Sequence, residues 1–91
     1  MEELEALVEA AQRGDASSFG RLVERFQGMA YASAYARLGD SHLAEDVAQE
    51  AFVDAYLSLG TLRDPAAFPG WFRRVLIKHS DRQYRVQAPQ A

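Results

Sequence analysis

Four basic side chains near the C-terminus recur at the spacing that lines residues up along one side of a helix. They are Arg74, Lys78, Arg82 and Arg85, and we call them the basic ridge. Neighbouring cations on a helix repel one another by roughly 0.2–0.5 kcal/mol per pair, and Asp81 is the acid close enough in sequence to relieve them. The ridge therefore favours binding of a phosphate backbone, with the adjacent Trp71 packed in the core. The alternative is a solvated ridge without a ligand.

A second pattern of chemically active side chains lies on the expected helix over residues 41–59. One side of that helix would carry what we call the acidic face: Asp46, Gln49, Glu50, Val53 and Leu57. A solvated face is normally polar throughout, whereas this one mixes acids with two sizeable aliphatic side chains. The mixture predicts a docking surface for a basic helical partner. The alternative is that the aliphatic residues are the scattered surface apolar groups of any protein.

The remaining candidate groups do not combine into a catalytic or metal site. His79 falls on an apolar helix side, which is typical of a packed core histidine. Asp46, Glu50 and Asp54 could share a helix side, but no Glu-x-x-His pairing accompanies them, so no metal is expected. The chain has no cysteine, no glycine-rich phosphate loop and no nucleophile elbow. We expect neither an enzyme nor a cofactor.

These surfaces require helices to position them, and the sequence predicts about four. Apolar residues recur at helical spacing over residues 2–13, 16–38, 41–59 and 69–85, and alternating strand patterns are absent. Gly14 and Gly39 are expected to end helices, and the aspartates that follow them to begin the next. The 16–38 helix is apolar on two sides, so we expect it to be central. The fold class is predicted to be a compact all-α bundle in one domain, residues 1–85, with a loop over 60–68 and a linker-like tail over 86–91.

Composition is consistent with a globular, soluble protein. The 91 residues are 48% hydrophobic and 25% charged, and the longest apolar run is far too short to span a bilayer. The acidic N-terminus is unlike a signal peptide, so we expect a cytoplasmic protein without a membrane partner.

The net charge of −3 hides an asymmetry between the two ends of the chain. Residues 1–67 carry five basic and twelve acidic side chains, whereas residues 68–91 carry five basic and one acidic, which suggests two partners of opposite charge.

Three segments together resemble region 2 of bacterial sigma factors, most closely the short extracytoplasmic-function (ECF) type. They are Gly14–Phe26 (GDASSFGRLVERF), Leu43–Phe52 (LAEDVAQEAF) and Phe68–Val75 (FPGWFRRV) continuing to Arg85. The resemblance covers about residues 3–85. The acidic block followed by tryptophan and a basic helix is a fairly specific combination, whereas either half alone would be weak.

The resemblance implies a function in transcription initiation. It implies that Asp46, Gln49 and Glu50, with Val53 and Leu57 beside them, dock on the clamp helices of the RNA polymerase core. It implies that the loop and the last helix melt and read the promoter −10 element, with contacts to the non-template strand. The residues expected to face DNA are then Arg63, Asp64, Arg74, Lys78, Arg82 and Arg85. A base pocket is expected in the 60–68 loop.

Two departures from the family pattern bear on this interpretation. Lys78 stands where the family often has asparagine, seven residues after the tryptophan, so base preference cannot be inherited. A second domain that reads the −35 element is also missing, and the chain is interpreted as an excised domain of a longer factor or a natural single-domain protein. The main rival interpretation is a helical interaction domain that binds a protein such as an anti-sigma factor without recognising DNA. A general single-stranded DNA binder is a third.

Overall fold

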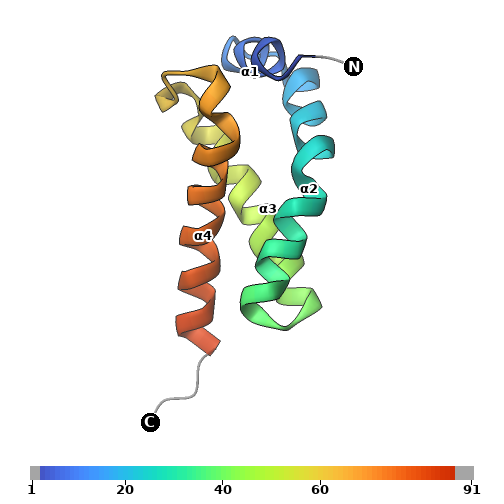
Figure 1. Ribbon diagram of the computed structural model, residues 1–91, viewed down its shortest axis with the longest axis vertical. Helices are drawn as coiled ribbons and strands as arrows, with labels where there is room; N and C mark the ends of the chain where they lie inside the picture. The colour runs from blue at the N-terminus through green and yellow to red at the C-terminus, as the bar shows by residue number, and fades with distance from the viewer. Residues whose placement is uncertain (1–2, 88–91) are drawn as a thin grey trace.

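The computed structural model describes residues 3–87, and these form an all-α bundle, which confirms the predicted fold class. The elements in chain order are α1 (Leu4–Gln12), α2 (Ala16–Leu38), α3 (Ser41–Ser58), two short 3₁₀ turns η1 (Leu59–Thr61) and η2 (Pro65–Ala67), and α4 (Phe68–Gln87). Figure 1 shows α2 and α4 along the length of the bundle, α3 running obliquely behind them, and α1 across the end near the two turns. As expected, α2 is central, because it packs against each of the other three helices.

Glycine–aspartate pairs separate the first three helices where the sequence predicts. Gly14 and Gly39 have positive φ angles of 100° and 68°, which glycine adopts without the steric cost of a side chain. Asp15 then caps α2 by accepting hydrogen bonds from the backbone N–H groups of Ser17 and Ser18. Asp40 caps α3 by accepting from the N–H of Leu43 at 3.0 Å. These caps explain why both boundaries could be predicted to within a residue.

Aromatic rings from three helices fill the centre of the bundle. Phe72 of α4 is fully buried, and its ring centroid lies 4.6 Å from that of Phe52 on α3 and 5.8 Å from that of Phe68. Phe26 of α2 contacts the same group, with its centroid 6.3 Å from that of Phe72. Trp71 is half-buried at the margin of this cluster, in agreement with its predicted packing.

Helix α4 is longer than the sequence predicts. It begins at Phe68 rather than Pro69 and continues to Gln87, so the linker-like tail does not start at residue 86; residues 88–91 lie outside the described residues. Contacts with the end of α2 account for the extra length. Arg37 forms an ion pair with Asp81 at 3.0 Å and lies over the ring of Tyr84, and the Gln87 side chain donates to the backbone carbonyl of Leu38.

None of the helices within residues 3–87 has the combination of length and apolar character that crossing a membrane requires.

Candidate functional site

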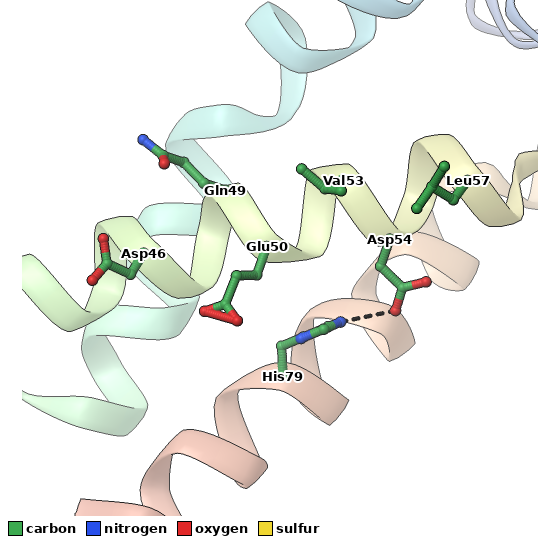
Figure 2. A pocket seen from close by; sticks show the side chains of 7 residues that line it. All are labelled: Asp46, Gln49, Glu50, Val53, Asp54, Leu57 and His79. Atoms are coloured by element: carbon green, nitrogen blue, oxygen red, sulfur yellow. Dashed lines mark hydrogen bonds and ion pairs between the residues drawn. The ribbon is translucent and has the colours of Figure 1, made fainter.

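A surface groove of about 590 Å³ runs between α3 and α4, and the whole acidic face contributes to its lining. The lining residues are Asp46, Gln49, Glu50, Val53, Asp54, Leu57 and His79. Figure 2 shows Glu50 and Asp54 directed toward α4, whereas Val53 and Leu57 project from α3 away from α4. Val53 and Leu57 are 59% and 77% exposed, so the bundle leaves most of their surface open to solvent. The predicted side-by-side arrangement of the five residues is therefore present in the fold.

Tyr56 is a further exposed apolar residue of α3 and was not among the predicted site residues. It is 51% exposed, and its ring packs edge-on against Phe19 of α2 with 5.1 Å between the centroids. Its position three residues after Val53 was a detectable signal, because residues three apart lie close together on a helix. Tyr56 extends the exposed apolar surface of α3.

Asp54 fastens α3 to α4 at the floor of the groove. One carboxylate oxygen, Oδ2, lies 2.8 Å from Lys78 Nζ and 2.8 Å from His79 Nε2, and the Ser58 hydroxyl donates to Oδ1 at 2.9 Å. The hydrogen bond from Lys78, followed by those from His79 and Ser58, holds the pKa of Asp54 well below its ordinary value. Because this pKa is lower in the folded than in the unfolded state, the contribution to stability is present at neutral pH and is lost on acidification.

His79 is largely buried, as expected, with 12% of its side chain exposed. Its predicted role was packing alone, and the bond to Asp54 adds a role in holding the two helices together. Asp54 itself was considered only as a metal ligand. No cluster of side chains suited to a metal ion occurs among residues 3–87.

The basic ridge is exposed along α4, but its ion pairs differ from those expected. Asp81 pairs with Arg37 of α2 and therefore does not relieve the ridge. Lys78 is instead neutralised by Asp54. The other members, Arg74, Arg82 and Arg85, are exposed and form no ion pair with any residue of 3–87. Three unpaired arginines on one exposed stripe present a surface suited to phosphate groups.

The segment before α4 is more ordered than the predicted loop. Gln12 of α1 donates hydrogen bonds from its side-chain Nε2 to the carbonyl oxygens of Leu59, at 3.1 Å, and Leu62, at 2.9 Å. Arg63 is exposed, whereas the Asp64 carboxylate accepts from the backbone N–H of Ala66 and so caps η2. The geometry gives Asp64 a local structural role. DNA contacts by Arg63 and Asp64, and the base pocket expected in this segment, stay predictions.

Replacing Gln12 with alanine is expected to loosen residues 59–62 with little effect on the bundle. The two carbonyl oxygens lose a common donor, while the buried Leu62 still anchors the segment. Amide hydrogen exchange should show faster exchange in residues 59–67 and unchanged protection in α2. Gln27→Ala, at an exposed position of α2, is the matched control. Equal exchange in the Gln12 and Gln27 variants would contradict the anchoring role.

A second groove, of about 510 Å³, lies between α2 and the first turn of α4. Arg25 and Arg73 flank it, and Phe26, Met29 and Pro69 contribute its apolar lining. This groove was not predicted from the sequence, because its two sides come from segments that are distant along the chain.

The chain matches the family Sigma-70 region 2 over residues 22–88. It belongs to this sigma-factor family. The RNA polymerase sigma-H factor of Pseudomonas aeruginosa is 41% identical over 76 residues, which are 84% of this chain and 39% of the relative. The ECF RNA polymerase sigma-E factor of Escherichia coli K12 is 40% identical over 73 residues, 80% of this chain and 38% of the relative. The resemblance to ECF-type region 2 is thereby confirmed.

A solved structure of region 2 has the same fold. It is the NMR structure of the complex formed by an engineered region 2 of sigmaE with GTAAAA, and it matches with a TM-score of 0.87 at 29% sequence identity. The match covers 94% of this chain and 90% of that one. By contrast, this region 2 chain spans about two fifths of the length of the curated relatives that it matches.

Proposed function

We propose that this sigma region 2 domain docks on the RNA polymerase core and captures the non-template strand of the promoter −10 element. Its partners are then the polymerase clamp helices and promoter DNA, and it acts with the polymerase in the cytoplasm. The single observation that carries the proposal is the match along nearly the whole chain to a sigmaE region 2 that was solved with GTAAAA. The domain works by binding, without a catalytic step of its own.

The acidic face is the proposed polymerase contact. Its exposed Val53 and Leu57 would be buried against a helical partner, where they supply apolar contact area. Asp46 and Glu50 beside them complement basic side chains, which favours approach in the correct orientation. The groove along α3 provides the concave surface that such a helix needs.

The basic ridge and the segment before it are the proposed DNA contact. Arg74, Arg82 and Arg85 would bind phosphates, which sets affinity and register without sequence information. Removing a base from the stack costs on the order of a few kcal/mol, and enclosure of that base by protein recovers the cost. The exposed Arg63 lies in the segment where the sequence predicts base recognition.

The decisive test is binding of the 91-residue chain to a purified clamp-helix fragment of the polymerase. Binding near micromolar strength is expected, with a loss of at least about tenfold for Glu50→Arg and for Leu57→Asp. Glu50→Arg brings a cation to a basic partner, and Leu57→Asp forces a charge into an apolar contact. Isothermal calorimetry measures both losses, and circular dichroism checks that helicity is retained.

Two control variants separate this interface from a general effect of charge. Glu9→Arg makes the same charge reversal at an exposed position of α1, and Val86→Asp places an acid at an α4 position that is 73% exposed. Both should bind like the wild type. No binding by the folded wild-type chain would reject polymerase docking and favour the anti-sigma interaction domain. Equal losses in the test and control variants would place the interface elsewhere.

A further inference from the structure

Lys78 occupies an unusual position between the two proposed interfaces. It belongs to the basic ridge of α4, yet its ammonium group lies 2.8 Å from Asp54, a residue that lines the α3 groove. Within residues 3–87 it is the ridge cation that has an acidic partner. Its side chain is 57% exposed, so a phosphate can still approach the ammonium group.

We propose that Asp54 competes with nucleic-acid phosphate for Lys78 and thereby lowers the affinity of the free domain for DNA. The proposal rests on the proposed function, because it assigns a control residue to the same DNA-binding ridge. Asp54 acts through Lys78 and does not itself contact DNA. It is therefore a positioning residue.

The hydrogen bonds around Asp54 make the exchange feasible. When Lys78 turns to a phosphate, the Asp54 carboxylate keeps the bonds from His79 and Ser58, so it is not left buried without partners. Lysine has a flexible four-carbon stem and three donors, which let it change partner without a backbone movement. Exposed ion pairs are weak, so a phosphate is strong enough to compete with this one.

The same geometry links DNA affinity to occupation of the α3 groove. A basic side chain that docks there can bind Asp54 and release Lys78 toward DNA. By thermodynamic reciprocity, DNA that takes Lys78 leaves Asp54 free to bind the incoming cation. Docking of a basic partner should therefore strengthen DNA binding by the wild-type chain more than by a chain that lacks the Asp54 charge.

The first test measures binding of a fluorescent single-stranded oligonucleotide containing GTAAAA to the 91-residue chain. Asp54→Asn keeps oxygen and nitrogen atoms that can bond His79 and Ser58 but removes the charge that holds Lys78. We expect it to bind the strand about two- to fivefold more tightly than the wild type, since that is the strength of a partly exposed ion pair. Glu45→Gln removes the same charge at an exposed position on the same helix and controls for net charge. Glu45→Gln should gain less affinity for the strand than Asp54→Asn.

The second test uses Lys78 and leaves Asp54 unchanged, so it stands even where the Asp54 variant folds poorly. Asp54 already forms an ion pair with Lys78, whereas Arg82 is an unpaired cation of the same ridge. The Lys78→Ala variant should therefore lose less affinity for the strand than Arg82→Ala. A third test combines the two changes: in the Lys78→Ala background, the gain in affinity from Asp54→Asn should fall to the gain from Glu45→Gln. This double-mutant cycle isolates the pair.

The outcomes distinguish this inference from the proposed function. If the wild-type chain binds the strand but Asp54→Asn binds it no more tightly than Glu45→Gln does, the proposed competition is wrong. The DNA-binding function then still stands. Equal losses for Lys78→Ala and Arg82→Ala overturn the competition in the same way. A wild-type chain that binds no strand, with or without the clamp-helix fragment, overturns both.

Discussion

A Phe72→Ala variant is expected to lose about half of the domain's free energy of unfolding. Phe72 is fully buried and lies against Phe52, Phe68 and Phe26, so its removal leaves a cavity bordered by rings from three helices. Phenylalanine-to-alanine changes in a core cost about 3–5 kcal/mol in the free energy of unfolding. Domains of this size have a total stability of only about 5–10 kcal/mol. Urea denaturation followed by circular dichroism measures the loss.

An exposed aromatic residue provides the control for this variant. Tyr35 is 46% exposed and stacks on Tyr31 of the same helix, so Tyr35→Ala should cost less than about 1 kcal/mol. Phe72→Leu, which keeps most of the apolar volume, should lie between the two. If Phe72→Ala and Tyr35→Ala were equally stable, the aromatic cluster would not be the centre of the core.

The helix boundaries were predictable where a local chemical signal marks them. Gly14 and Gly39 adopt the left-handed conformation that glycine favours. The aspartate after each glycine caps the next helix by accepting hydrogen bonds from backbone N–H groups no more than three residues further along. The end of α4 has no such signal. Its last turn is held by the contact of Tyr84 with Arg37 and by the hydrogen bond from Gln87 to Leu38, and the sequence does not reveal contacts between segments so far apart.

The same distinction applies to the candidate site. The acidic face was predictable because its five residues lie on one helix, where spacing alone fixes which side they share. The pairing of Lys78 with Asp54 depends on how α3 packs against α4, and the sequence offered Asp81 as the nearer acid. Gln12 was missed for a similar reason, because it anchors a segment 47–50 residues away. Contacts made by tertiary packing therefore redefine what an individual charged residue can do.

Reversing two unpaired ridge charges is expected to cause the largest loss of DNA affinity. Arg74→Glu combined with Arg82→Glu replaces two phosphate contacts with two repulsions, and we expect the Kd for a GTAAAA-containing single strand to rise by about 100-fold or more at low salt. Both residues are exposed, so the fold should be preserved. Fluorescence anisotropy over a series of salt concentrations measures the affinity and its salt dependence.

The salt dependence identifies the physical origin of the loss. Each phosphate contact to a single strand contributes about 0.7 to the slope of log K against log salt, so the slope should become shallower by about 1.4. The double variant Arg74→Lys with Arg82→Lys keeps both charges and should retain most of the affinity and nearly the full slope. Arg13→Glu, an exposed reversal on α1, should change little. A ridge that binds phosphate must lose affinity and slope together, so a large loss of affinity at an unchanged slope would show that the two arginines act by some route other than contact with the DNA backbone.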